Sequence, residues 1–192
     1  MNKPIGAIVL AAGFSSRFGS SKLLAPLSNG KTVFQQTMDR IADALPDRVV
    51  VTRPELASQL RELAPHTSVL SFDQAEQGMG ATLAFAAQHT HNWDGCIVCL
   101  ADMPFIETAT YRLIAERVSS DRIVTPSFDS RPGNPVAFGS DFFAELRALT
   151  GDSGGKKLTS LHPQAVLELK VTDPGILQDI DTQDELERYQ GA

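Results

Sequence analysis

The stretch IGAIVLAAGFSSRFGSSK, residues 5–22, decides the fold. Its first seven residues, Ile5–Ala11, are apolar throughout and lack the alternation of a half-exposed strand, so they predict a strand that is buried on both faces. Strands of this kind occur almost only in parallel sheets covered by helices. The turn that follows is rich in glycine and serine, and it falls at the carboxyl end of the strand, where open α/β sheets bind ligands.

The rest of the chain repeats this alternation of strand and helix. Apolar stripes run from Phe34 to Leu45 and from Leu56 to Leu63, and Thr182-x-x-Glu185 is a capping box that opens a last helix. We expect one domain over residues 1–192, an α/β fold with a Rossmann-like, mostly parallel sheet and helices on both faces. Between residues 129 and 161 the alternation of strands and helices is less regular, and we expect an insertion, a lobe or an oligomer surface there. Further strands are expected at 48–52, 68–72, 96–101, 122–126, 135–138 and 165–171.

Composition excludes several classes of function. The 192 residues carry 17 lysines and arginines against 23 acidic residues, a net charge of -6, which disfavours broad binding to nucleic acid. No apolar run approaches the ~20 residues of a membrane span. Cys96 and Cys99 are three apart on an expected strand, so they point to opposite faces and neither form a disulfide nor share a metal. Unpaired thiols are typical of a reducing compartment, so we expect a cytoplasmic protein.

The loop after the first strand has the chemistry of a phosphate cradle. Gly13 lets the backbone approach a ligand, Ser15 and Ser16 offer hydroxyl groups, and Arg17 and Lys22 supply two positive charges. The spacing is neither that of the P-loop nor that of the dinucleotide fingerprint. The alternative interpretation is a mobile surface loop with two solvated cations.

Acidic residues follow two other segments. Asp102 comes directly after the expected strand 96–101, where a single carboxylate suits Mg²⁺. Asp179 and Asp181 alternate around Ile180, so they point the same way and either could be the second metal ligand; we favour Asp181. The alternatives are a turn or helix cap for Asp102 and a cap of the last helix for Asp181.

Three glycine-bearing turns are weaker candidates. Gly78 and Thr82 lie in a turn that opens an alanine-rich helix, and its glycines allow a flat base or a phosphate to approach. Asn134 lies in the turn 131–136, and Lys156 lies in the turn 151–157 before a helical stretch. Lysines beside a helix N-terminus attract anions, so the turn with Lys156 could bind an anion. Ordinary turn chemistry is the alternative for all three segments.

Taken in order, these motifs resemble the MobA-like nucleotidyltransferases. The resemblance rests on Leu10-Ala-Ala-Gly13 with Arg17 and Lys22, Leu100-Ala-Asp102-Met-Pro104, Gly133-x-Pro135-Val136, Gly151-Asp-x-Gly-Gly-Lys156 and Asp179-Ile-Asp-Thr182, and it spans nearly the whole chain. It implies a fold of the nucleotide-diphospho-sugar transferase type. Among the family's members the sequence is most similar to the molybdenum cofactor cytidylyltransferases, which join CMP from CTP to molybdopterin and release pyrophosphate.

The resemblance also implies roles for single residues. Arg17, Lys22 and Asp102 would be catalytic, and Asp102 and Asp181 would hold Mg²⁺, with Mn²⁺ as a substitute. Asn134 and Lys156 would contact the phosphorylated pterin, and a molybdoenzyme would receive the product. The nucleotide would contact Leu10, Ala11, Ala12, Gly13, Ser15, Ser16, Arg17, Lys22, Gly78 and Thr82.

Two positions bear on the substrates. Guanylyl members carry Leu-Ala-Gly-Gly where this chain has Leu-Ala-Ala-Gly, and the methyl group of Ala12 leaves less room, which fits a smaller base. The family usually has histidine where Asn134 stands, and asparagine cannot titrate near neutral pH. The alternatives are therefore guanylyl transfer from GTP, a different phosphorylated acceptor such as a sugar phosphate, and a non-catalytic nucleotide-binding chaperone of a molybdoenzyme.

Overall fold

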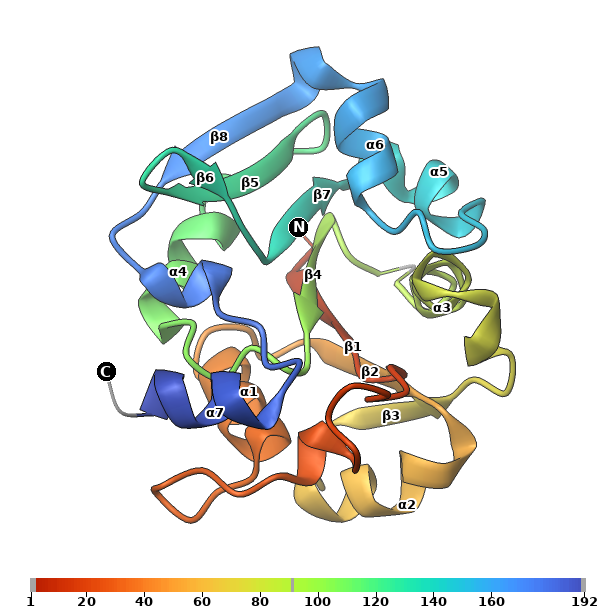
Figure 1. The fold of residues 1–192 in the computed structure, drawn as a ribbon. Coiled ribbons are helices and arrows are strands. Elements are labelled where there is room, and N and C mark those ends of the chain that lie inside the picture. Colours follow the sequence, from red (N-terminus) through yellow and green to blue (C-terminus); the bar gives the residue numbers. More distant parts are fainter. Residues whose placement is uncertain (1–2, 91, 191–192) are drawn as a thin grey trace.

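A computed structural model describes residues 3–90 and 92–190. A single sheet of eight strands crosses the molecule in the order β3-β2-β1-β4-β7-β5-β6, with β8 paired to β5 (Figure 1). The strands are β1 Ile5–Leu10, β2 Arg48–Thr52, β3 Ser68–Ser71, β4 Gly95–Leu100, β5 Ile123–Phe128, β6 Arg131–Pro132, β7 Val136–Gly139 and β8 Val166–Lys170.

The first half of the sheet is parallel. Strands β3, β2, β1 and β4 run the same way, as do β5 and β8, whereas β7 is antiparallel to both β4 and β5. The predicted α/β fold with a mostly parallel sheet is confirmed. Since β1, β3 and β4 end at one edge, the loops that follow them come together there. Within the segment 129–161, β7 lies inside the sheet between β4 and β5.

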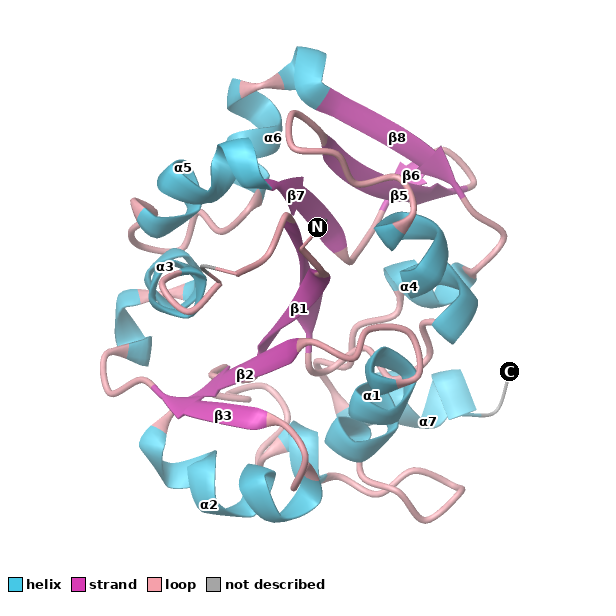
Figure 2. Cartoon of the chain, turned by 180° about the vertical axis from the view of Figure 1, so that it is seen from behind, coloured by secondary structure: helices cyan, strands magenta, loops and turns pink. Residues whose placement is uncertain are grey.

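Helices cover both faces of the sheet, as Figure 2 shows from behind. One apolar cluster joins the sheet to α1, α2 and α4, and a second joins its other face to α3, α5 and α6. A third, smaller cluster joins α7 to the loop after β1 through Leu186, Phe18 and Ile180. The helices are α1 Val33–Ala42, α2 Pro54–Leu63, α3 Met79–Ala87, α4 Thr108–Ala115, α5 Phe143–Arg147, α6 Lys156–Leu161 and α7 Gln183–Gln190.

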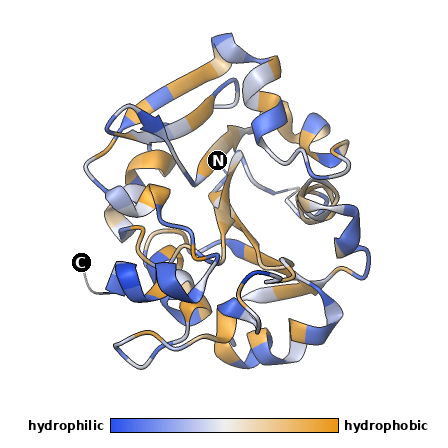
Figure 3. Ribbon diagram, viewed as in Figure 1, coloured by the Kyte–Doolittle hydropathy of each residue, from blue (hydrophilic) through white to orange (hydrophobic). Residues whose placement is uncertain are grey.

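Apolar residues concentrate in the central strands and polar residues on the outer helix faces (Figure 3). Cys96 and Cys99 are fully buried on β4 and unpaired, and they belong to the clusters on opposite faces, which confirms the expectation for these thiols. Burial raises the pKa of the Cys96 thiol to about 12. None of the described helices combines the length and apolar character that crossing a membrane requires.

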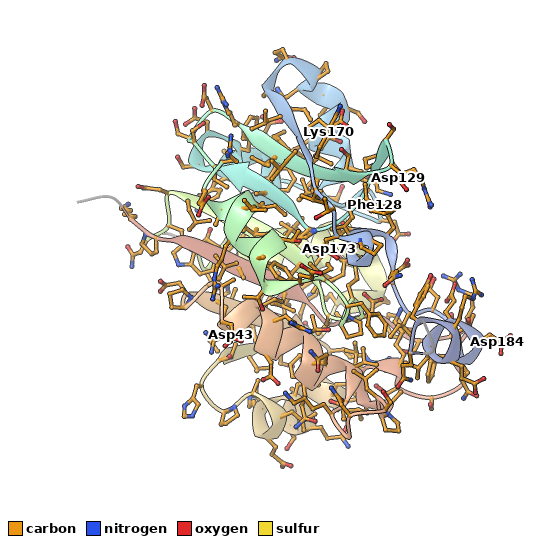
Figure 4. All side chains as sticks on the ribbon, turned by 90° about the vertical axis from the view of Figure 1, so that its left-hand side faces the viewer. Asp43, Phe128, Asp129, Lys170, Asp173 and Asp184 are labelled. Carbon is orange, nitrogen blue, oxygen red and sulfur yellow. The ribbon has the colours of Figure 1, made fainter. Side chains whose placement is uncertain are left out.

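Buried Asp173 fixes the chain that leads from β8 to α7 (Figure 4). Its Oδ2 atom accepts hydrogen bonds from the Glu107 backbone N–H at 2.8 Å and from the Thr110 hydroxyl at 2.6 Å, at the start of α4. Its Oδ1 atom accepts from the Gly175 N–H at 2.8 Å. The segment that contains Asp179 and Asp181 therefore leaves from an anchored point.

Candidate active site

A cavity of about 440 Å³ opens at the edge of the sheet where β1, β3 and β4 end. Residues from the ends of these strands and from the loops after them line it, together with two later segments of the chain. The lining residues are Leu10, Ala11, Ala12, Gly13, Phe14, Arg17, Lys22, Leu23, Ala75, Glu76, Gly78, Met79, Thr82, Leu100, Asp102, Asp152, Asp179 and Asp181.

Four of these side chains form one network of ion pairs. The Lys22 ammonium lies 2.6 Å from Asp102 Oδ2 and 2.8 Å from Asp181 Oδ1, and the Arg17 guanidinium lies 2.6 Å from Asp181 Oδ2. The Lys22 side chain is only 11% exposed, so its charge depends on these partners. The structure thus brings together the two cations and the two carboxylates that the sequence singles out, although they come from three distant segments.

The last segment reaches this network because of a buried isoleucine. Ile180 is fully buried against α7, and the flanking Asp179 and Asp181 both line the cavity, as the alternation predicts. Thr182 caps α7 with Glu185: the Glu185 N–H donates to the Thr182 hydroxyl oxygen at 3.2 Å, and the Thr182 N–H donates to the Glu185 carboxylate at 2.9 Å. With the cap supplied by Thr182, the Asp181 carboxylate is left for the cavity.

The pKa values of the Asp102 and Asp181 carboxyl groups are shifted in opposite directions. Burial lowers the pKa of Lys22, but the charges of Asp102 and Asp181 outweigh this effect and hold that pKa above its ordinary value. Burial raises the pKa of the Asp102 carboxyl despite the opposing charge of Lys22. The hydrogen bond from Lys22 lowers the pKa of Asp181, which is the more exposed of the two. Asp102 is therefore the carboxylate for which a further cation would compensate most.

The residues at this network fit part of a divalent metal site. Asp102 Oδ1 is buried and has no hydrogen-bond partner among the described residues. No group of three or more His, Cys, Asp or Glu side chains suited to a metal occurs in the described part of the chain. Mg²⁺ is commonly held by one or two carboxylates together with substrate phosphates and water, so Asp102 and Asp181 match the protein's share of such a site.

The turn after β1 is fixed to β2 and leaves free space in the cavity next to Gly13. The Ala11 N–H donates to the Val51 carbonyl at 2.8 Å, and the Thr52 hydroxyl donates to the Ala11 carbonyl at 2.9 Å, so the turn is fixed to β2. Ala12 is nearly buried in the cavity wall, and a Cβ atom placed on Gly13 would meet nothing within 4 Å. The wall at Gly13 therefore has space for a ligand.

The glycine turn after β3 forms the facing wall. Gly78 has φ +104°, and a side chain there would collide with the Asp152 carboxylate and with the Gly151 backbone. The Gly80 N–H donates to the Gly151 carbonyl at 2.6 Å, and the Thr82 hydroxyl donates to the Gly78 carbonyl at 3.1 Å. Gly78 and Thr82 thus lie in the cavity wall, as predicted, against a turn from far along the chain.

Four predicted residues lie outside the cavity lining. The Ser15 hydroxyl oxygen instead accepts from the Lys22 backbone N–H at 3.3 Å, which fixes the loop, and Ser16 is exposed. The Asn134 N–H donates to the Ile176 carbonyl at 3.0 Å, and Lys156 begins α6 with its side chain exposed. The structure therefore brings neither predicted acceptor residue to the cavity wall.

Sequence reasoning missed Asp152 and Glu76, which line the cavity. Asp152 lies in the glycine-rich turn 151–157 that the sequence marks as unusual, but the spacing of that turn does not tell which of its residues faces a ligand. The contact between this turn and Gly78 joins positions more than seventy residues apart. The glycine-rich composition of the turn 151–157 was the sequence feature that could have indicated Asp152.

The sequence profile of the MobA-like NTP transferase domain matches residues 7–166. The chain belongs to the MobA-like NTP transferase family. This MobA-like protein is therefore a nucleotidyltransferase, and the resemblance described above is confirmed at the level of the family. The probable molybdenum cofactor guanylyltransferase of Rhodopirellula baltica is 29% identical over 104 residues, which are 53% of this chain and 49% of that protein.

Other relatives match over different lengths. The purine catabolism protein PucB of Bacillus subtilis is 29% identical over 198 residues, covering 96% of this chain and 95% of PucB. The bifunctional protein GlmU of Sphingopyxis alaskensis is 31% identical over 143 residues, covering 72% of this chain. The match covers only 32% of that GlmU, so this MobA-like chain corresponds to about a third of it.

Solved structures confirm the fold over the whole chain. Rv0371c of Mycobacterium tuberculosis H37Rv superposes with a TM-score of 0.88 at 30% identity, covering 100% of both chains. A complex of the same mycobacterial protein with manganese gives a TM-score of 0.85 at 28% identity and also covers both chains fully. A structural relative of this MobA-like protein has thus been solved with a divalent metal.

Proposed function

We propose that this protein transfers CMP from CTP to the phosphate of molybdopterin, with Mg²⁺ or Mn²⁺, and releases pyrophosphate. The observation that carries the proposal is the network of Arg17, Lys22, Asp102 and Asp181 at one end of the cavity. It gathers two cations for a triphosphate and two carboxylates for a metal. The Leu-Ala-Ala-Gly turn and the full-length similarity to solved family members support the same reading.

The residues suit a reaction that needs positioning rather than proton transfer. An oxygen of the acceptor phosphate forms a new bond to the α-phosphorus of CTP, the bond from that phosphorus to the bridging β-phosphate oxygen breaks, and pyrophosphate leaves with the electron pair. The acceptor phosphate is already anionic at pH 7, so no general base is required. In-line alignment and neutralisation of charge then carry the catalysis.

Each charged residue has a share in that neutralisation. Arg17 pairs with the phosphates through its planar fork, and Lys22 acts as a point charge. Asp102 and Asp181 would hold the metal ion, which when bound supplies further positive charge at the α-phosphate. Lys22 and Arg17 contact these carboxylates directly, so the phosphates of CTP would compete with Asp102 and Asp181 for the two cations.

Ala12 supports the choice of CTP over GTP. Its methyl group stands in the cavity wall at the position where guanylyl members have glycine, so less space remains for a purine. Asn134 stands where the family usually has histidine, and neither Asn134 nor Lys156 lines the cavity, so a second candidate function is nucleotidyl transfer to a different phosphorylated acceptor, such as a sugar phosphate. The cavity residues that hold the nucleotide would be the same in both cases.

One assay tests both functions. Pyrophosphate release is measured with each of the four nucleoside triphosphates and Mg²⁺, with molybdopterin, with a sugar phosphate and with no acceptor. We expect release with CTP only when molybdopterin is present. Release with CTP and a sugar phosphate instead would establish the second function, release with GTP would overturn cytidylyl transfer, and binding of CTP without any release would indicate a non-catalytic role.

A binding experiment isolates the choice of base. CTP with Mg²⁺ should raise the melting temperature more than GTP with Mg²⁺, because a ligand stabilises the folded state by RT ln(1 + [L]/Kd). Equal shifts from both nucleotides at matched concentrations would contradict the argument from Ala12.

A further inference from the structure

We propose that Asp152 selects the nucleobase, its carboxylate accepting a hydrogen bond from an exocyclic amino group such as N4 of cytosine. The inference rests on the proposed function and goes beyond it, because it names the group that distinguishes CTP from UTP. Ala12 limits the size of the base, whereas cytosine and uracil have nearly the same size. Discrimination between these two bases needs a polar group that reads the edge of the ring.

Asp152 is held at the cavity by backbone contacts. Its carboxylate lies against Gly78, where a side chain would displace it, and the neighbouring Gly151 carbonyl accepts a hydrogen bond from the Gly80 N–H at 2.6 Å. Both Asp152 and Gly78 line the cavity. The carboxylate therefore belongs to a turn fixed on the start of α3, although it is itself accessible to a ligand.

The charges of the cavity indicate which part of a nucleotide meets Asp152. Asp102 and Asp181 have Lys22 and Arg17 as partners, but among the described residues no cation forms an ion pair with the other carboxylates of the cavity, which are Asp152 and Glu76 at the glycine turn and Asp179 beside Asp181. A triphosphate carries several negative charges, so it is attracted to the two cations and repelled by the two carboxylates at the glycine turn, where no cation offsets them. The phosphates then lie at the Lys22 end, and the base or the ribose lies at Asp152.

The wall beside Asp152 suits a flat ring. Gly78 has no side chain, and its φ of +104° is a conformation that residues with a side chain rarely adopt, so this part of the wall stays bare backbone. A base lying on that backbone would present its edge to the Asp152 carboxylate. An ionised carboxylate only accepts hydrogen bonds. A carboxylate that faces position 4 of the ring therefore fits the amino group of cytosine and repels the O4 carbonyl oxygen of uracil.

The test is the ratio of the affinities for CTP and UTP, measured by calorimetry with Mg²⁺. The wild-type protein should prefer CTP by roughly 10- to 100-fold, the range that a hydrogen bond to a charged group accounts for. Asp152→Asn should bring the ratio close to one, because an amide can donate to O4 as well as accept from N4. Asp152→Ala should weaken CTP binding and leave UTP binding nearly unchanged or stronger.

A matched control is Asp184→Asn, which removes the same charge from an exposed position on α7 outside the cavity (Figure 4). This variant should keep the wild-type CTP/UTP ratio. Melting temperatures of all variants without ligand should agree, since Asp152 is exposed and makes no ion pair in the described structure. An unchanged ratio in both Asp152 variants would overturn the proposal.

The ribose is the competing partner, and 2′-deoxy-CTP distinguishes it. If Asp152→Ala weakens the binding of CTP and UTP equally but leaves the binding of 2′-deoxy-CTP unchanged, the carboxylate contacts a ribose hydroxyl. The proposal that Asp152 selects the base is then wrong. If pyrophosphate release selects GTP, cytidylyl transfer fails on its own. The role of Asp152 is then decided by GTP against ITP, which lacks the amino group: loss of that preference in Asp152→Asn supports it, and its retention overturns it.

Discussion

The two walls of the cavity are built by different means. The charged wall consists of Arg17, Lys22, Asp102 and Asp181, joined by ion pairs between side chains. The glycine wall is formed at Gly78 and Asp152, and backbone contacts of Gly78 and Gly80 with the turn 150–152 hold it together. A side chain can change its partner while the backbone stays in place, whereas a contact between backbone atoms can change only if the backbone itself moves. The charged wall is therefore the part that rearranges around a ligand, and the glycine wall is the part that keeps its shape.

This difference separates the effects of substitution. A change in the charged wall should alter catalysis and binding while the fold persists. A change in the glycine wall should lower the free energy of unfolding before it alters chemistry. The following predictions test that division, in order of decreasing effect.

The largest effect is expected for Asp102→Asn. The substitution keeps the size of the side chain but removes the charge that a metal ion needs, so turnover at saturating Mg²⁺ should fall by roughly two decades or more. The variant should still fold, because Lys22 keeps Asp181 as a partner at 2.8 Å. Retention of more than a tenth of wild-type turnover would show that Asp102 is a residue of the turn only.

Lys22→Ala should come next. Loss of a contact to a charged group costs ~1.5–3 kcal/mol, so kcat/KM for CTP should fall by about one to two decades. Arg17→Lys keeps the charge and loses the planar fork, so its loss should be smaller. Lys31→Ala is the matched control, because Lys31 pairs with Asp39 at 2.6 Å on the exposed surface. A kcat/KM for Lys22→Ala within threefold of the wild type would mean that the loop does not hold the phosphates.

The glycine wall is tested by Gly78→Ala. A residue with a side chain at this φ is strained, and its Cβ would collide with the turn 150–152, so the free energy of unfolding should drop by ~1–3 kcal/mol in urea. Gly13→Ala is the comparison, since Gly13 lines the same cavity but its added Cβ meets open space. It should weaken nucleotide binding at unchanged stability. Equal losses of stability in the two variants would remove the distinction between the walls.

The smallest effect concerns the metal alone. Lys22 lies between Asp102 and Asp181, so it should compete with Mn²⁺ for them. In Lys22→Met that competitor is gone, and Mn²⁺ should raise the melting temperature by a few degrees more than it does in the wild type. A shift of about 2–4 °C corresponds to roughly 1 kcal/mol in a chain of this size. Lys31→Met should respond to Mn²⁺ as the wild type does, and an equal response of Lys22→Met would show that Lys22 does not compete.

Much of the fold and part of the charged wall could be predicted from the sequence. Unbroken apolar runs mark β1 and β4 as central strands, and the carboxyl ends of parallel strands meet at one edge, so Asp102 and the loop with Lys22 had to come together there. The direction of β7 could not be predicted, because a four-residue apolar strand has the same pattern whether it runs parallel or antiparallel.

The glycine wall could be predicted from the sequence only in part. The sequence marks Gly78 and the turn 151–157 separately, but nothing in their spacing shows that one packs on the other. The same limit applies to the pairing of Lys22 with Asp181, which are 159 positions apart. Asp102 and the loop with Lys22, which strand direction brings to this edge, lie at the cavity as expected. Asp152 reaches the cavity through a contact between distant turns, which the sequence does not indicate.

The two buried cysteines of β4 can report when the helical layers on either face of the sheet open. Cys96 and Cys99 face different helical layers, and a fully buried thiol reacts with an alkylating reagent only after the layer that covers it opens. Labelling rates in native buffer, read for each cysteine by mass spectrometry, would therefore time the opening of each layer separately. Equal rates would mean that both layers separate from the sheet in one event, and unequal rates would identify the layer that separates first.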